Sequence, residues 1–289
     1  MGNFHRPPIK PVKHPVQSQD YIKPVMLLRR NDSLNTPCYP YGIAIQKCTH
    51  HIFVTDGRPF GRISIFTSSF NFITTFNYPG MLSPCGIAIQ NDNIFVSDTA
   101  GIVFSFQEDI GFCQVSSVSG RSFNFLGLRG IALSQDGRLY IAEQYHDRIQ
   151  VLNSDDLKLI YRLSHRSLKN PVNVIVNESE LYVLGFGVHV FSLNGDMHRS
   201  IIQQKVGSFT ILSSRFFCMD SQNIIITDSN NNRIQVYSNQ GQLIYSIITG
   251  GEFDRILQYS RGIAMTSESN IVVACVDGIY QFKNPINTI

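Results

Sequence analysis

The sequence predicts an all-β fold, a six-bladed β-propeller of four-stranded antiparallel blades whose ring is closed by an N-terminal strand. Three observations lead to this fold class: the composition, a repeat of about 44 residues, and four short β-type runs in each repeat. The chain has 289 residues, of which 43% are apolar and only 16% are charged, with 20 Phe and 12 Tyr but no Trp. Low charge with abundant aromatic and β-branched residues is typical of β-rich proteins.

The repeat is set by a segment of the type Pro-x-Gly-Ile-Ala-Ile, which is clearest at residues 40–45 and 84–89. Its steps along the chain are 44, 44, 43, 43 and 46 residues, a regularity that indicates one structural unit copied six times. The third position of the segment falls at residues 42, 86, 130, 173, 216 and 262.

Each unit contains four short runs, which in the first unit are residues 40–45, 52–56, 62–66 and 70–76. Turn residues such as those at 135–137 separate the runs, so each unit is predicted to form one antiparallel sheet. Six such sheets favour a six-bladed propeller, and the missing Trp excludes the WD type. The first run is apolar at nearly every residue, which predicts a strand buried on both faces.

The sixth unit is incomplete, because only seven residues follow its third run at 279–282. We expect residues 21–28 to supply the missing strand, which would close the ring and remove an exposed sheet edge. Pro24 suits such an outer strand. The propeller is then predicted over residues 20–289, with residues 1–19 as a disordered basic, Pro-rich tail. Residues 8–13 of the tail also fit a short PxxPx(K/R) ligand motif, although a simple disordered leader is the plainer interpretation.

The pattern Pro-x-Gly-Ile-Ala-Ile, then Ile-Phe-Val-x-Asp, then Arg-Ile-Gln-Val-Phe/Tyr, resembles the NHL repeat. The clearest copy of its second half is Ile-Thr-Asp228-Ser-Asn-Asn-Asn-Arg233-Ile-Gln-Val-Tyr237. The resemblance covers roughly residues 38–283 and is weakest in the fourth unit, where Gly185-Phe-Gly-Val replaces the Asp…Arg segment. It implies a propeller that acts as a platform for proteins or RNA, as in tripartite-motif proteins. The RING, B-box and coiled-coil portions of those proteins do not occur in this sequence, so ubiquitin-ligase activity does not carry over. A second NHL-like branch, the peptide-amidating lyases, is catalytic through a zinc held by His.

Three units place an acid at the end of the second run and an Arg at the start of the third. These pairs are either ligand contacts or structural ion pairs, and their repetition favours the structural interpretation. The pairs are Asp56 with Arg62, Glu143 with Arg148, and Asp228 with Arg233.

Metal binding is not favoured by the placement of Cys and His. Cys48, His50 and His51 form the densest cluster and lie in one loop, whereas His146 and His165 fall in other loops on one face. A zinc site normally needs three or four ligands, so we expect no metal and no cofactor. Neither a phosphate-binding glycine loop nor a nucleophile elbow occurs. The sequence therefore predicts a protein that is not an enzyme.

Charge separates between the two faces of the predicted propeller. The face formed by the blade-to-blade loops and the loops between second and third strands, called the top face, holds twelve bases and eight acids. The opposite, bottom face holds three bases and eleven acids. Arg with interleaved aromatics suits a protein hot spot or single-stranded RNA. The candidate top-face ligand residues are Arg58, Arg121, Arg129, Arg166, Lys169, Arg215, Arg255, Arg261, Phe123, Tyr145 and Tyr259.

Together these patterns predict a non-enzymatic scaffold that recognises a protein partner through its top-face loops. The alternative is single-stranded RNA binding by the same face, and a zinc-dependent lyase of the peptide-amidating type is the third candidate. No apolar run is long enough to span a membrane, the N-terminus lacks a secretory signal, and the six cysteines form no CxxC pair. We therefore expect a cytoplasmic monomer that does not bind membranes.

Overall fold

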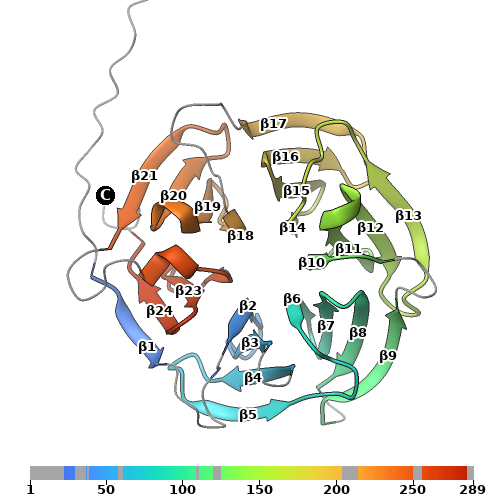
Figure 1. Ribbon diagram of the computed structural model, residues 1–289, viewed down its shortest axis with the longest axis horizontal. Coiled ribbons are helices and arrows are strands. Elements are labelled where there is room, and N and C mark those ends of the chain that lie inside the picture. The colour runs from blue at the N-terminus through green and yellow to red at the C-terminus, as the bar shows by residue number, and fades with distance from the viewer. Residues whose placement is uncertain are drawn as a thin grey trace, which may run out of the picture.

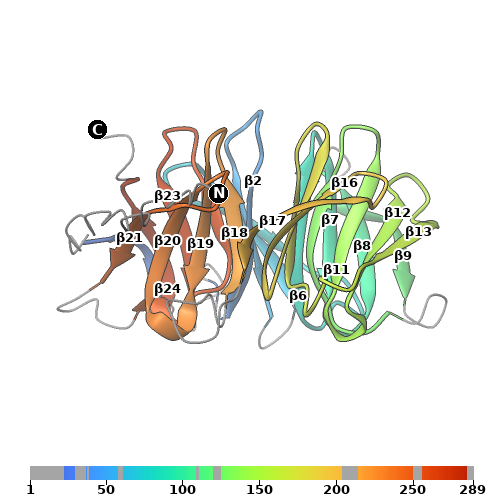
Figure 2. The same ribbon diagram turned by 90° about the horizontal axis from the view of Figure 1, so that it is seen from above.

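A computed structural model describes residues 23–29, 37, 39–57, 61–108, 111–119, 125–203, 214–249 and 256–284. They form six four-stranded antiparallel sheets arranged as a ring (Figure 1), and the innermost strands of all six sheets line a channel along its axis. This confirms the predicted six-bladed propeller. The top face points toward the viewer in Figure 1 and lies along the lower edge of Figure 2. Among the described residues, no helix has the length and apolar character needed to cross a bilayer.

Each blade runs from its innermost to its outermost strand in chain order. Blade 1 consists of β2 (Pro40–Ile45), β3 (Ile52–Asp56), β4 (Arg62–Phe66) and β5 (Phe72–Phe76). Blade 2 consists of β6 (Pro84–Gln90), β7 (Asn93–Asp98), β8 (Ile102–Gln107) and β9 (Cys113–Ser119). Blade 3 consists of β10 (Leu128–Leu133), β11 (Arg138–Glu143), β12 (Arg148–Asn153) and β13 (Leu159–Ser164). Blades 4 and 5 consist of β14 (Asn173–Val176), β15 (Glu180–Gly185), β16 (Gly187–Ser192) and β17 (Met197–Gln203), and of β18 (Ser214–Met219), β19 (Asn223–Asp228), β20 (Arg233–Ser238) and β21 (Leu243–Ile248).

The sixth blade is completed from the other end of the chain, as predicted. It contains β22 (Ile263–Met265), β23 (Ile271–Cys275) and β24 (Gly278–Phe282), and its outer strand is β1 (Val25–Arg29), which pairs antiparallel with β24. The strand starts directly after Pro24, whose nitrogen has no hydrogen to donate to a sheet. Residues 1–22, which include the predicted tail and the first residues of the expected strand, lie outside the described part of the chain.

The repeated glycine of the sequence motif lies where neighbouring inner strands approach most closely. A Cβ on Gly42 would collide with the carbonyl oxygen of Cys85 in the next blade, and a Cβ on Gly86 would lie 2.7 Å from the carbonyl oxygen of Arg129. Thr55 reinforces the first of these contacts, because its hydroxyl accepts from the Gly42 N–H at 2.7 Å and donates to the Cys85 carbonyl at 3.0 Å. The motif therefore encodes blade-to-blade packing around the channel.

The core lies between adjacent blades rather than at the centre of the ring. In β3 every residue is buried, whereas in β2 the last two residues, Ala44 and Ile45, are only partly buried. The prediction that the first strand is buried on both faces is thus wrong, because the inner strands line the channel with one face. A section of the channel with a volume of about 360 Å³ is lined by apolar residues of these strands, including Ile87 and Val174.

Candidate functional site

The acids at the ends of the second strands form buried ion pairs on the top face. Arg62 Nε lies 3.0 Å from Asp56 Oδ2, and the corresponding distances are 2.5 Å from Arg148 to Glu143 and 2.9 Å from Arg233 to Asp228. All three carboxylates are fully buried. Burial opposes ionisation of Glu143, yet hydrogen bonds from Arg148, His146 and Gln150 hold its pKa below the usual range.

Two of these carboxylates also bind the backbone of the loop that enters their own blade. Asp56 accepts the Tyr39 N–H at 2.6 Å and Glu143 accepts the Leu126 N–H at 2.9 Å, in both cases from residues just before the inner strand. Asp98 plays this part in blade 2, where it accepts the N–H groups of Leu82 and Ser83. Asp56, Asp98 and Glu143 thus each fix the backbone of a top-face loop, which makes these loops rigid supports for the side chains they carry.

Blade 4 lacks this acid, since Gly185 stands in its place, and the neighbouring blade compensates. A Cβ on Gly185 would collide with the carbonyl oxygen of Lys169 in the entering loop. Asp147 of blade 3 takes over, accepting the Asn170 N–H at 2.8 Å and the Lys169 ammonium at 2.8 Å. These bonds, with the Asn170 N–H as the largest contribution, lower the pKa of Asp147. The weak fourth repeat therefore builds a regular blade by a different set of contacts.

One repeat position supplies a ring of side chains to the top end of the channel. This position directly precedes the motif glycine or its replacement, so each blade contributes one residue there. The six residues are Tyr41, Cys85, Arg129, Val172, Arg215 and Arg261.

Tyr41 joins the ring across the channel. Its hydroxyl accepts a hydrogen bond from Arg129 Nη1 at 2.9 Å and another from Arg215 Nη1 at 3.1 Å. The Arg261 guanidinium lies over the Tyr39 ring, 3.6 Å from its centroid, and 5.1 Å from that of Tyr41. One tyrosine from blade 1 thus gathers arginines from blades 3, 5 and 6.

The partners of these arginines are neutral. Burial raises the pKa of Tyr41 above its usual value, and burial raises that of the Cys85 thiol to about 11. Within the described part of the chain, no carboxylate lies in ion-pairing distance of Arg129, Arg215 or Arg261. The cluster therefore concentrates positive charge that the described residues do not compensate.

A pocket of about 220 Å³, called the top pocket, opens beside this cluster on the top face. Arg129 and Arg215 line it together with Tyr145, Phe186 and the hydroxyl-bearing Ser214. Its remaining lining residues are Tyr41, Gln144, Asn170, Val172, Gly185 and Phe216.

Exposed large apolar side chains are distributed unevenly over the molecule. Among the described residues, half of them lie on the outermost strands and the other half on top-face loops, whereas the bottom-face loops carry none. Leu82 is 66% exposed and Tyr145 is 64% exposed. The top-face members are Tyr78, Leu82, Leu126, Tyr145, Phe186 and Tyr259.

The predicted ligand residues fall into three groups. Arg129, Arg215 and Tyr145 line the top pocket, and Arg261 adjoins it. Tyr259, Arg166 and Lys169 are exposed on loops that enter blades 6 and 4, and Lys169 is paired with Asp147. The remaining four candidates, Arg58, Arg121, Arg255 and Phe123, lie outside the described residues.

Sequence reasoning missed Tyr41, Ser214 and Gln144 as site residues. Tyr41 could have been found, because it shares its repeat position with three of the arginines. Ser214 and Gln144 carry no such signal, since only the folded ring brings blade 5 opposite the loop of blade 3.

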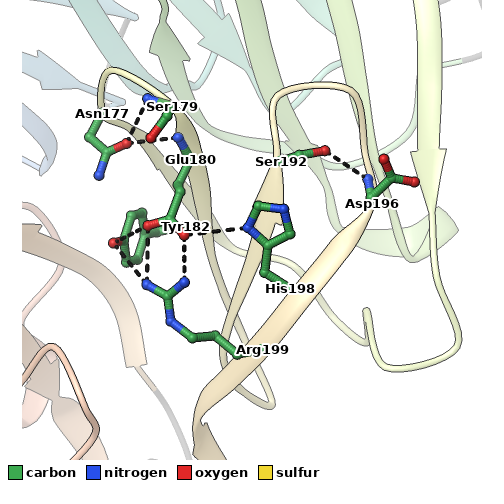
Figure 3. Close-up of polar contacts among 8 residues, drawn as sticks. All are labelled: Asn177, Ser179, Glu180, Tyr182, Ser192, Asp196, His198 and Arg199. Atoms are coloured by element: carbon green, nitrogen blue, oxygen red, sulfur yellow. Dashed lines mark hydrogen bonds and ion pairs between the residues drawn. The ribbon is translucent and has the colours of Figure 1, made fainter.

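The negative charge of the bottom face is weaker than the count of loop residues suggested. Figure 3 shows Glu180, at the start of β15, held by Arg199 of β17, with Nη1–Oε1 at 2.5 Å and Nη2–Oε2 at 3.1 Å. Tyr182 and His198 also reach this carboxylate, at 2.8 and 3.4 Å. The Arg199 bonds lower the pKa of Glu180 to about 2 against the opposing effect of burial. The sequence-based count of bottom-face charge does not include Arg199, which lies in β17.

The histidines considered as metal ligands have separate partners. His146 Nδ1 lies 2.7 Å from Glu143 Oε1, whereas His165 packs edge-on against Phe191 and accepts the Ser167 N–H. Within the described ranges, no three side chains of His, Cys, Asp or Glu are arranged to hold one metal ion.

Comparison with known proteins supports the fold. The sequence matches no protein-family model, and no curated protein sequence is significantly similar to it. The similarity to the NHL family therefore stays a prediction.

Solved structures, in contrast, match over most of the chain. A streptogramin B lyase is 12% identical with a TM-score of 0.64, covering 91% of this chain and 97% of the lyase chain. A catalytically inactive virginiamycin B lyase from Staphylococcus aureus with quinupristin is 13% identical with a TM-score of 0.66, covering 91% and 100%. A nidogen/laminin complex is 15% identical with a TM-score of 0.60, covering 72% and 80%. At these identities the likeness shows a shared propeller fold.

The prediction that the protein is not an enzyme is contradicted by these comparisons. Two of the similar structures are lyases, so this architecture is used by enzymes as well as by proteins that form complexes. The error arose because a repeated fold without a catalytic motif was taken to be non-catalytic, whereas function resides in sites and not in folds.

Proposed function

We propose that the protein is a binding platform that recognises a protein partner with its top-face loops. The observation that carries the proposal is the placement of exposed large apolar side chains, which among loops of the described chain occur on the top face alone. Most of these loop side chains are aromatic, and aromatic residues are enriched at protein interfaces.

The residue types on this face support a protein ligand. The residues that contribute most to binding at protein interfaces are often Tyr, Trp and Arg. Aromatic side chains placed beside arginines therefore fit a protein interface. Tyr145 and Phe186 line the same pocket as Arg129 and Arg215. The carboxylates that anchor the entering loops keep this surface in place, which reduces the entropy lost on binding.

The experiment compares two matched double variants of the full chain. Tyr145→Ser with Phe186→Ser removes exposed aromatics from the top face, whereas Ile160→Ser with Leu243→Ser removes exposed apolar residues from the outer strands. Proteins captured by the immobilised wild type are purified and titrated against all three forms. We expect the top-face variant to weaken binding by about tenfold or more and the outer-strand variant to leave it unchanged.

Equal binding of all three forms would contradict the proposal. So would retention of single-stranded RNA that depends on Tyr145 and Phe186 and falls steeply between about 50 and 200 mM salt, because phosphate contacts show that salt dependence. The NHL relationship, cytoplasmic location, monomeric state and structural role of the three ion pairs remain part of this proposal.

A further inference from the structure

The top pocket contains donors and positive charge for which the described residues provide no counterpart. We propose that it is a carboxylate-binding subsite, which takes the side chain of an acidic residue in a peptide segment of the partner. This inference rests on the proposed function and specifies the chemistry of its ligand.

Charge is the first argument. Arg129, Arg215 and Arg261 converge on Tyr41, and within the described ranges none of them is paired with a carboxylate. Elsewhere on the top face, Arg62, Arg148 and Arg233 each have an acid as partner. Arg166 also lacks an acid partner in the described part of the chain, but it is exposed and does not line the pocket. The unpaired arginines at or beside the pocket are therefore Arg129, Arg215 and Arg261.

Unsatisfied buried donors are the second, independent argument. Ser214 lines the top pocket, is only 8% exposed, and its Oγ has no hydrogen-bond partner among the described residues. Arg261, which adjoins the pocket without lining it, is also 8% exposed, and its Nη1 has no partner in the same part of the chain. A buried polar group without a partner costs free energy in the free protein, and a ligand acceptor would recover it.

The site is also held in position before any ligand arrives. Arg129 Nε donates to Gln144 Oε1 at 2.7 Å, and Gln144 Nε2 donates to Asn170 Oδ1 at 2.8 Å. Asn170 is itself fixed by the bond from its N–H to Asp147. This relay from blade 3 to the loop entering blade 4 orients the guanidinium, so binding requires little reordering of side chains.

Size and lining favour a peptide side chain over a nucleic acid. A volume of about 220 Å³ corresponds to about seven water molecules, enough for one side chain. Phe186, Tyr145 and Phe216 provide apolar contacts for the methylene groups of such a side chain. The planar fork of a guanidinium matches a carboxylate with two parallel hydrogen bonds.

The test is an NMR titration of the full chain labelled with ¹⁵N-arginine, observing the Nε–H resonances. The probes are N-acetyl-glutamate methylamide, the uncharged N-acetyl-glutamine methylamide, and inorganic phosphate. We expect saturable shifts of Arg129 and Arg215 with the glutamate probe and none with the glutamine probe. Arg215→Gln should weaken binding by about tenfold or more. Arg162→Gln, which removes the same charge from an exposed position of the outer strand β13, should leave it unchanged.

Saturation by phosphate without saturation by glutamate would overturn the carboxylate assignment. The absence of saturation with every probe, or equal weakening by Arg162→Gln, would overturn the subsite itself. A partner that depends on Tyr145 and Phe186 while glutamate fails to bind leaves the proposed function standing and refutes this inference. Saturation by glutamate in a protein with no top-face partner supports the subsite and refutes the proposed function.

Discussion

Replacing Gly42 by Ala tests whether the repeated glycine holds the blades together. The added Cβ would overlap the Cys85 carbonyl oxygen of the next blade and lie 3.2 Å from Thr55 Oγ1. Backbone must move to accept it, and overpacking of this kind costs about 1–3 kcal/mol. Ala also lowers the conformational entropy of the unfolded chain, which offsets the loss of stability by about 0.4–1 kcal/mol. We therefore expect a net loss of about 1–2 kcal/mol, or a fall in Tm of about 2 °C or more.

Gly57→Ala is the matched control in the same blade. A Cβ there meets Ser83 Oγ at 3.6 Å and Tyr39 Cδ1 at 3.9 Å, which are ordinary contacts. Its φ is not positive, so Ala should raise stability by about 0.4–1 kcal/mol through the unfolded state. Thermal unfolding by circular dichroism compares the two variants with the wild type. Equal Tm values for Gly42→Ala and Gly57→Ala would refute the packing role of the motif.

Three further variants probe single interactions. Thr55→Val removes the buried hydroxyl that links blades 1 and 2, so we expect a loss of about 1–3 kcal/mol in thermal unfolding; an unchanged Tm would contradict that link. Because the pKa of Glu180 is lowered to about 2, its stabilisation is present above its ordinary pKa and disappears as the pH falls toward 2. The Tm deficit of Glu180→Gln should thus shrink between pH 5 and 2, whereas Glu178→Gln, at an exposed position, should differ little from the wild type throughout. Arg215→Met relieves repulsion among like charges, so it should raise stability by about 0.5 kcal/mol at low salt and less at high salt; a large fall in Tm would show that the arginine cluster is structural.

The Arg215 variants connect the stability of the protein with its proposed activity. A binding site commonly retains groups that the free protein would be more stable without. If Arg215→Met stabilises the chain while Arg215→Gln weakens the glutamate probe, the arginine is kept for ligand recognition rather than for folding. The carboxylate-paired Arg233 provides the contrast, since its removal leaves the buried Asp228 carboxylate without its ion-pair partner.

The overall fold could be predicted because it depends on a pattern that every blade repeats. Steps of 43 to 46 residues between equivalent motif positions predict one sheet per unit. The apolar run before the first unit was expected to complete the sixth sheet, and β1 does pair with β24. The burial of the strands was harder to predict. Apolar content does not distinguish β2, which lines a channel, from β3, which is enclosed by two neighbouring strands of its own sheet.

The candidate site was only partly predictable. Arg129, Arg215 and Tyr145 were assigned to the top face from loop topology, and they do line one pocket there. The repeat position that Tyr41 shares with three arginines did not show which of them its hydroxyl bonds, and these lie 88 and 174 residues away. Nor did the sequence indicate that Asp147 replaces the acid missing at Gly185. Face charge was also misjudged, since the count could not include pairing between strands such as that of Glu180 with Arg199.

The sequence by itself determined the number of blades, their order and the face on which arginines and aromatics gather, because these follow from local periodicity and strand direction. Only the tertiary structure decided which of those arginines are neutralised and which are not. Closing the ring brings residues from blades 1, 3, 5 and 6 within a few ångströms, and the partner of each charge is set by those distances rather than by its neighbours in the chain. The top pocket, with its arginines and unpaired donors, is a product of that closure.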